Sequence, residues 1–136
     1  MSEDTHHGHC LCGATQFEVK GTPAWVGHCH CSSCRRATAS SIATFVCFKK
    51  DGFKVTAGEM TQFESSAGVY RSFCPKCGTP MTYEADALGE EIHIQLGSLD
   101  KPEDFPAIVE VYCAEKLPWL QIDVAGPSFE SLPPQG

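Results

Sequence analysis

The chain has 136 residues, of which 42% are hydrophobic and 20% are charged, and its formal net charge is −7. These values are typical of one soluble globular domain and not of a disordered protein. The sequence pI is about 5.2, and the lysines and arginines are scattered. We therefore do not expect a protein that binds nucleic acid through a basic surface. No stretch approaches the roughly 18 apolar residues of a membrane span, so a membrane is not expected as a partner either.

The predicted elements are mostly short β-strands, because runs rich in β-branched and aromatic residues are separated by turn residues. Strands are expected at residues 14–21, 41–48, 53–58, 60–66, 68–74 and 90–99, and one strand followed by a proline-broken segment within 107–122. The runs from residue 53 to residue 74 look like successive strands of a meander. In the 90–99 run, Ile92 and Ile94 are expected to face inward, with His93 on the opposite face.

Only residues 32–40 favour a short helix, with Ser32 or Ser33 as its amino-terminal cap. The predicted fold class is therefore all-β, with one or two short helical turns. We expect residues 1–126 to form a single domain. Residues 127–136 are proline-rich and lack periodicity, so they are expected to form a tail that lies on the surface or is disordered.

Nine cysteines are present, although the polar and acidic start MSEDTHHGHC has no apolar segment of the kind that a secretory signal needs. This combination favours a reducing compartment, in which thiols stay free or bind metal instead of forming disulfides. We therefore expect a cytoplasmic protein.

Two cysteine pairs, Cys10 and Cys12 in CLCG and Cys74 and Cys77 in CPKCG, are each followed by glycine. Their close spacing lets a tight turn aim both thiols at one point, and the glycine permits a left-handed backbone in which nearby N–H groups point at the sulfur atoms. The two pairs together predict a closed, structural zinc site with four thiolates. A redox pair or two disulfides are the alternatives, but the first lacks its usual βαβ context and the second fits a reducing compartment poorly.

Three more cysteines, Cys29, Cys31 and Cys34, lie close together in the segment VGHCHCSSCRR. Cys29 and Cys31 point to the same side of an extended chain, and Cys34 returns toward them from the following turn. Three thiolates can bind one zinc ion, and a site with three protein ligands leaves a fourth position for water or substrate, as catalytic zinc sites do. The sequence therefore predicts two zinc ions per chain, the second with an open coordination position.

A fourth protein ligand would close that position. The candidates in the sequence are His28, His30, Cys47, Cys113, His93 and the amino-terminal histidines His6, His7 and His9. Side chains alternate along a strand, so His30 is expected to point away from the two cysteines beside it. Cys47 and Cys113 are typical of small buried residues, and the amino-terminal histidines are typical of a solvated segment.

Zinc lowers the pKa of a coordinated thiol so far that the thiol loses its proton. A site with three thiolates is electron-rich and therefore suits a soft fourth ligand better than water. Arg35 and Arg36 follow the last cysteine of this group, and Arg71 lies shortly before the CPKCG pair. An arginine near the open position would hold a carboxylate through two hydrogen bonds, whereas an ordinary surface charge is the alternative for each of the three. The pattern favours a small, anionic, thiol-bearing ligand.

The chain contains, in this order, the segments GHCLCGATQFEVKG, CHCSSCRRATAS, YRSFCPKCGTPMTYE, GSLD and EKLPWL. Together they resemble the glutathione-dependent formaldehyde-activating enzyme family, which also includes centromere protein V, over about residues 8 to 122. The resemblance implies a zinc-binding fold of the β-tent type with two zinc sites. The structural zinc would be held by Cys10, Cys12, Cys74 and Cys77, and the catalytic zinc by Cys29, Cys31 and Cys34.

The resemblance also implies a carbon–sulfur lyase that condenses formaldehyde with glutathione to S-hydroxymethylglutathione, the thiolate attacking the aldehyde carbon at or near the second zinc. Two positions depart from the family pattern. Ala39 stands where many relatives have glycine, and Glu110 stands where many have a histidine two residues before an aromatic residue, here Tyr112. A zinc-dependent enzyme acting on glutathione or a related thiol adduct is the leading prediction. A thiol carrier without catalysis and a structural zinc domain for protein interaction are the alternatives.

Overall fold

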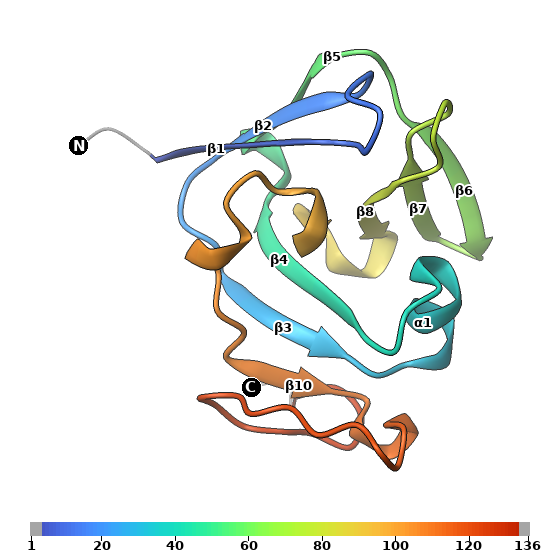
Figure 1. The fold of residues 1–136 in the computed structure, drawn as a ribbon, viewed down its shortest axis with the longest axis vertical. Helices are drawn as coiled ribbons and strands as arrows, with labels where there is room; N and C mark the ends of the chain where they lie inside the picture. The colour runs from blue at the N-terminus through green and yellow to red at the C-terminus, as the bar shows by residue number, and fades with distance from the viewer. Residues whose placement is uncertain (1–3, 134–136) are drawn as a thin grey trace.

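Two β-sheets form the framework of the described part of the chain, residues 4–133 of the computed structural model. The smaller sheet has the strand order β1-β2-β5, and the larger has the order β10-β3-β4-β9-β8-β7-β6. The strands are β1 Thr5–His9, β2 Gln16–Lys20, β3 Trp25–Cys29, β4 Ala43–Lys49, β5 Phe53–Ala57, β6 Thr61–Ser66, β7 Val69–Phe73, β8 Pro80–Ala85, β9 Glu91–Gln95 and β10 Val109–Val111. Figure 1 shows the smaller sheet above the part of the larger sheet that contains β3, β4 and β10. The predicted all-β class is confirmed.

The helix α1 Ser32–Thr38 follows β3 almost directly, as predicted. Its cap is different from the prediction: Cys31 holds the N-cap position with an extended backbone, and no side chain caps the helix. Ser32 and Ser33 already belong to the helix, because the chain turns immediately after the last extended residue. The remaining helical segments are single 3-10 turns, η1 Lys50–Gly52, η2 Asp86–Leu88, η3 Leu96–Ser98, η4 Pro102–Asp104 and η5 Cys113–Glu115. Within residues 4–133 no helix combines the length and the apolar character needed to span a membrane.

Three strands, β1, β3 and β8, were not among the predicted strands, and β5 lies in a different sheet from the one expected. β1 contains the histidines that seemed solvated, but the ring of His6 packs against Phe48 and Phe105 at centroid distances of 5.6 and 5.0 Å. The strand β5 pairs with β2 and not with β6. Gly58, with a φ of 70°, turns the chain between β5 and β6 from one sheet to the other. The meander is instead β6-β7-β8-β9.

The two faces of the larger sheet differ in composition. Side chains of one face, among them Val46, Phe48, Ile92 and Ile94, form the main hydrophobic core with Phe17 and Val19 of the smaller sheet. The opposite face, which we call the cysteine face, carries Cys29, Phe45, Cys47, His93 and Tyr83, because these positions alternate with core residues and pair across neighbouring strands. The predicted alternation in β9 is confirmed, but His93 on the second face is also buried, with 7% exposure.

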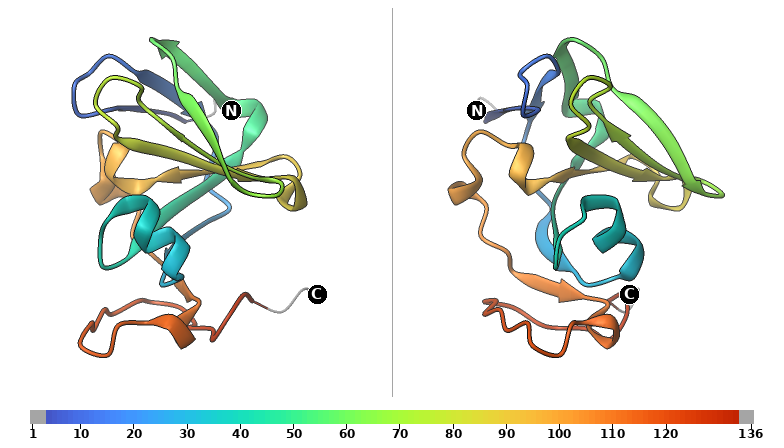
Figure 2. Two further views of the ribbon diagram at one scale, coloured as in Figure 1. Left: turned by 90° about the vertical axis from the view of Figure 1, so that its right-hand side faces the viewer. Right: turned by 45° about the vertical axis from the view of Figure 1, so that its right-hand side comes forward.

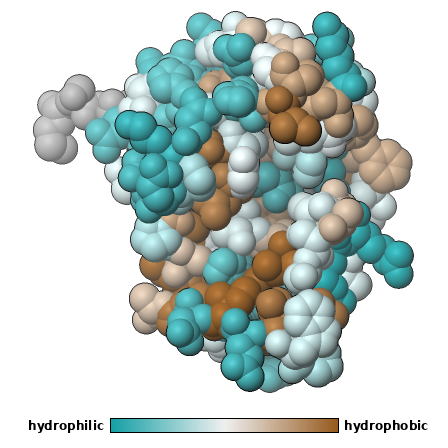
Figure 3. Space-filling view, viewed as in Figure 1, coloured by the Kyte–Doolittle hydropathy of each residue, from teal (hydrophilic) through white to brown (hydrophobic). Residues whose placement is uncertain are grey.

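The segment after residue 126 pairs with β10. The Glu110 N–H donates to the Pro127 carbonyl (3.1 Å), and the Phe129 N–H donates to the Glu110 carbonyl (2.9 Å). Figure 2 shows β10 and the segment paired with it at the end of the molecule opposite the smaller sheet. In Figure 3, hydrophobic side chains gather over β10. The predicted tail at 127–136 therefore lies against β10 at its start. Residues 134–136 of that tail are outside the described range.

Candidate metal centres

Two turns of matching shape bring four cysteines together. One turn joins β1 to β2 and begins at Cys10, and the other joins β7 to β8 and begins at Cys74. In each turn the first cysteine donates its N–H to the carbonyl of a threonine, Thr15 or Thr79, at 3.0 Å. The glycines that follow the second cysteines, at positions 13 and 78, both have a φ of 79°. The left-handed backbone predicted from the glycines is thus present in both turns.

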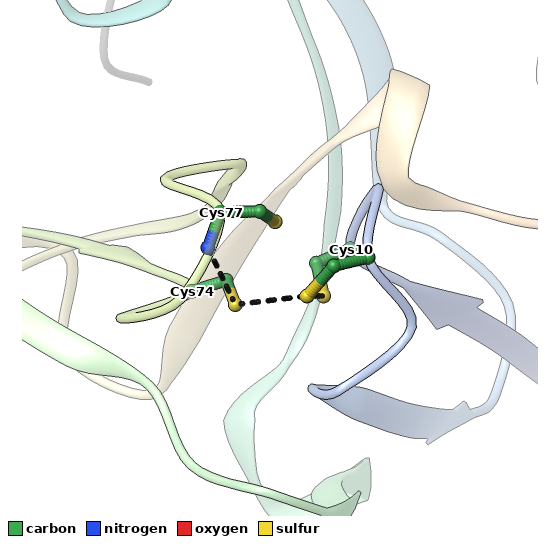
Figure 4. A group of neighbouring side chains, drawn as sticks. Cys10, Cys74 and Cys77 are labelled. Carbon is green, nitrogen blue, oxygen red and sulfur yellow. Dashed lines mark hydrogen bonds between the residues drawn. The ribbon is translucent and has the colours of Figure 1, made fainter.

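Backbone N–H groups point at the sulfur atoms inside these turns. Cys10 Sγ accepts from the Thr15 N–H at 3.3 Å. Cys74 Sγ accepts from the N–H groups of Lys76 and Cys77 at 3.4 and 3.5 Å. Figure 4 shows the 74–77 turn facing Cys10 across the gap between the two hairpins. These donors stabilise negative charge on sulfur, which four thiolates around one divalent ion require.

The spacing of the four sulfur atoms fits one tetrahedral zinc ion. All four lie within 4.8 Å of one another, with Cys10 Sγ to Cys12 Sγ at 3.6 Å and Cys12 Sγ to Cys74 Sγ at 3.9 Å. Two sulfurs bound at about 2.3 Å in tetrahedral geometry are about 3.8 Å apart, whereas disulfide sulfurs are about 2.0 Å apart. All nine cysteines are free thiols. The donor set is compatible with zinc.

Two of these thiols are predisposed to ionise even without a metal. Hydrogen bonds from the hydroxyl and backbone of Thr79 lower the pKa of Cys77 to about 5. Hydrogen bonding by Thr15 and by the backbone of the 74–77 turn also lowers the pKa of Cys74. Thiolates are the metal-binding form of cysteine, so these bonds favour metal uptake at neutral pH.

The second cluster forms where β3 passes into α1. Cys29 ends β3, Cys31 precedes the helix, and Cys34 lies in its first turn. Their sulfurs lie within 4.8 Å of one another, and Cys29 Sγ donates to Cys34 Sγ at 3.6 Å. Cys29 and Cys34 are buried, while Cys31 is half-buried. Among residues 4–133, no fourth histidine, cysteine or acidic side chain joins this group. The three thiols are compatible with one zinc ion that keeps an open position.

Arg71, from β7, lies beside this cluster. Its Nη1 and Nη2 atoms are 3.8 and 3.9 Å from Cys34 Sγ, and its guanidinium lies over the ring of Tyr83, 4.9 Å from the centroid. The hydrogen bond from Cys29 lowers the pKa of Cys34 to about 6, burial opposes this shift, and the charge of Arg71 adds to it. Of the three arginines singled out in the sequence, Arg71 is thus the one whose guanidinium lies next to a sulfur of this cluster.

Arg35 and Arg36 have different surroundings. Arg35 donates from Nη1 to the carbonyls of His30 and Glu115, the latter at 2.7 Å, and so ties the cysteine segment to η5. Arg36 lines a surface cavity of about 680 Å³ with Arg35, Ser32 and Leu117 as further lining residues. The structure does not bring these two guanidinium groups to the sulfur atoms as it does that of Arg71.

Three aromatic side chains and one valine pack around the three cysteines, and most of them lie far from the cysteines in the chain. Trp25, Tyr83, Val111 and Tyr112 pack against the cluster formed by the cysteines and Phe45. Tyr112 has a left-handed backbone with a φ of 56°, which is uncommon for a residue other than glycine. Burial and the nearby thiols raise the pKa of Tyr112, so its phenol stays protonated at neutral pH. Residues held in such sparsely populated backbone conformations tend to lie at functional sites.

The proximity of Arg71 and Tyr83 could have been read from the sequence. These residues lie at similar distances on either side of the CPKCGT turn, and they are directly paired between β7 and β8. Trp25 and Tyr112 had no comparable signal, because β10 pairs with β3 across about eighty intervening residues and a parallel pairing needs such a crossover.

His30 points away from the cysteines beside it, as expected from alternation, and it is fully buried. Its Nε2 is 2.8 Å from Glu110 Oε1, and Glu110 also accepts from the Ser128 hydroxyl at 2.8 Å and from Lys116 Nζ at 3.4 Å. Cys113 lies near this pair. Burial opposes ionisation of Glu110, but the bonds from these three donors outweigh it, so the pKa of Glu110 is lowered. The Glu110 carboxylate, at a position where the sequence departs from the family pattern, therefore holds His30 on the side opposite the cysteines.

The remaining ligand candidates also lie elsewhere. His28 Nδ1 bonds to the Thr44 hydroxyl at 2.7 Å. Cys47 is fully buried, as expected, but its sulfur lies within 4.8 Å of ligand atoms of Glu91 and His93. Burial raises the pKa of Cys47 to about 12, and it lowers the pKa of His93, so both groups are neutral near pH 7 in the absence of a metal.

The sequence model of the family described as glutathione-dependent formaldehyde-activating enzyme matches residues 5–115, a range that includes both cysteine clusters. A search of the curated proteins found no match. Among solved structures, the crystal structure of a Rhodobacter sphaeroides protein matches with a TM-score of 0.60 and 25% sequence identity, over 72% of this chain and 93% of that chain. The family match covers well over half of the chain, and the segments that carry the earlier resemblance fall mostly within it. The chain therefore belongs to the glutathione-dependent formaldehyde-activating enzyme family.

Proposed function

We propose that the protein is a zinc-dependent carbon–sulfur lyase acting on glutathione or a related thiol adduct, with S-hydroxymethylglutathione formation from formaldehyde and glutathione as its reaction. Two zinc ions per chain, one in each cysteine cluster, are part of the proposal. The observation that carries it is the three-cysteine cluster, which has no fourth side-chain ligand within residues 4–133. Family membership supports the choice of thiol and aldehyde.

Cys29, Cys31 and Cys34 would hold the zinc ion, which as a Lewis acid would lower the pKa of an incoming thiol so that the thiol loses its proton at neutral pH. The side chains around the cluster bind and orient that ligand. Arg71 forms no salt bridge with an acidic side chain of the described residues, so its guanidinium is available for a carboxylate of glutathione. We assign Arg35 to positioning, because its donors are used by backbone carbonyls. Arg36 lines a surface cavity beside α1, so it would contact the ligand only if part of the ligand extended beyond this helix.

The condensation forms a bond between the glutathione sulfur and the aldehyde carbon. The thiol loses one proton in this step, and the aldehyde oxygen gains one. Tyr112 is suited to hydrogen-bond that oxygen, because its phenol packs at the cluster and stays protonated. Its backbone is held by the N–H bond to the Ser131 carbonyl at 2.9 Å. We therefore propose Tyr112 as the donor to the aldehyde oxygen.

NMR exchange spectroscopy with formaldehyde and glutathione tests the proposal. The zinc-loaded protein is expected to accelerate exchange between glutathione and S-hydroxymethylglutathione above the spontaneous rate. Cys31→Ser is expected to abolish this acceleration, because the half-buried thiol that it removes belongs to the open cluster. Cys113→Ser removes a thiol outside both clusters and is the matched control, expected to retain full acceleration.

An exchange rate equal to the spontaneous one in the zinc-loaded protein would defeat the enzymatic proposal. Saturable glutathione binding measured by calorimetry under the same conditions would then identify a carrier, and no binding would identify a structural domain.

We also infer that residues 1–126 form a single domain followed by the tail 127–136, and that the protein works in the cytoplasm with a small thiol as its partner. The free state of all nine cysteines supports a reducing compartment. Alkylation of acid-quenched cells followed by mass spectrometry is expected to find the thiols reduced, and a disulfide within either cluster would contradict this location.

A further inference from the structure

A third group of metal-ligating side chains lies on the cysteine face, in neither of the two clusters already described. Cys47 on β4 is directly opposite His93 on β9, and Glu91 is two residues before His93, so all three side chains project from the same face. Their ligand atoms lie within 4.8 Å of one another. Cys29, at the other cluster, pairs with Ala43, four residues before Cys47 on β4. The two groups are therefore about 13 Å apart along the strand.

We propose that Cys47, Glu91 and His93 form a divalent-metal site suited to zinc. Sulfur, imidazole nitrogen and carboxylate oxygen are the three ligand types that zinc takes in proteins. His93 Nε2 is 3.3 Å from Glu91 Oε1. Two such ligands bound at about 2.0–2.1 Å in tetrahedral geometry are about 3.3 Å apart. The adjacent strands β4 and β9 hold the three ligands on a rigid frame.

A second unassigned group, His30 with Glu110 and Cys113, differs in the state of its carboxylate. Glu110 already receives a lysine, a histidine and a serine as hydrogen-bond donors, so a metal would have to displace a positive charge. Glu91 forms no salt bridge with lysine or arginine within the described residues. A bound cation would supply the positive charge that this carboxylate lacks.

Neighbouring aromatic rings hold the His93 imidazole in place, and the group of Cys47, Glu91 and His93 is open to solvent on the side of Glu91. Trp25 meets the His93 ring edge-on at a centroid distance of 4.7 Å, and Tyr83 stacks on it at 5.6 Å. Cys47 is fully buried, whereas the Glu91 side chain is 42% exposed. An ion would enter past Glu91, and water or a small anion would take the fourth position. Because Tyr83 also packs at the three-cysteine cluster, the two sites share an aromatic wall.

Cadmium-113 NMR tests the site without reference to the proposed enzymatic activity. Cadmium replaces zinc at thiolate-containing sites, and its chemical shift separates ligand sets with four, three and one sulfur. The protein loaded with excess cadmium is expected to give three resonances, of which the one at highest field belongs to the one-sulfur site. Cys47→Ser and His93→Gln are each expected to remove this resonance alone.

The control variant is Cys113→Ser, which removes the same kind of thiol from the group of His30 and Glu110 and is expected to leave all three resonances unchanged. The four-sulfur resonance reports in every sample that the fold is intact. Glu91→Gln, at a partly exposed position, is expected to keep the fold and to weaken cadmium binding at the one-sulfur site by roughly 10–100-fold. The proposal is overturned if the loaded protein gives no one-sulfur resonance, or if that resonance persists in Cys47→Ser or disappears in Cys113→Ser.

Discussion

The two cysteine clusters use the same ligand atom, but different groups surround it. The four-cysteine cluster joins two hairpin turns, and its sulfurs are contacted by backbone N–H groups and by threonines of the same turns. The three-cysteine cluster is contacted by side chains from distant segments of the chain, among them Arg71 and Tyr112. We therefore expect the four-cysteine cluster to anchor the two sheets to each other when a metal is bound, and the three-cysteine cluster to bind a ligand.

The largest expected effect is on the first cluster. Cys77→Ser removes one of four ligands from a zinc site whose binding free energy is typically 10–16 kcal/mol, so about 3 kcal/mol of stability should be lost. Thermal unfolding is expected to shift down by about 10 °C. Circular dichroism melts of the zinc-loaded protein measure this, with Cys113→Ser as control. A shift as small as that of the control would show that the four-cysteine cluster is not the structural anchor.

Cys31→Ser makes the same chemical change in the second cluster and should have the opposite consequence. The fold is expected to stay intact, with a melting temperature within about 3 °C of the unsubstituted protein, while the bound zinc falls by one ion per chain. Elemental analysis and the melt together measure this. If Cys31→Ser unfolds the chain as severely as Cys77→Ser, both clusters are structural, and the contrast between them does not hold.

A smaller effect is expected from Arg71→Met on the metal-free protein. The pKa of Cys34, about 6 because of the Cys29 hydrogen bond and the Arg71 charge, should rise when the charge is removed, since a cation favours the thiolate. Below the new pKa the thiol is protonated, so thiolate absorbance should develop at higher pH than before. Ultraviolet titration measures the midpoint, with Arg36→Met as control. An unchanged midpoint would mean that Arg71 does not act on the cluster.

The smallest effect concerns the turn behind the second cluster. Ala39 has a φ of 53° at the end of α1, where glycine avoids a steric cost of about 1–2 kcal/mol. Because glycine also loses more backbone entropy on folding, Ala39→Gly should stabilise the protein by only about 0.5 kcal/mol. Ala37→Gly, inside the helix, should destabilise it by about 0.5–1 kcal/mol. Chemical denaturation measures the free energy of unfolding of both variants. If the two substitutions change it in the same direction, the left-handed backbone at Ala39 is contradicted.

Several features of the site were readable from short stretches of sequence. The CLCG and CPKCG spacings predicted two turns with left-handed glycines, and Gly13 and Gly78 have that conformation. The alternation in β9 predicted that Ile94 and His93 lie on opposite faces. Neither the cap of α1 nor the pairing of β5 was correctly predicted, because serine is a good cap in many turns and consecutive strands usually pair with each other.

The sequence alone determined which residues can bind metal and how the nearby backbone turns, because spacing and glycine act within a few residues. The tertiary structure decided which side chains border each cluster. It placed Arg71 beside Cys34, packed Tyr112 against the three-cysteine cluster, buried Glu110 against His30, and set Cys47 opposite His93. Each of these contacts joins segments far apart in the chain, and their pairing depends on how whole sheets pack, which no local pattern specifies.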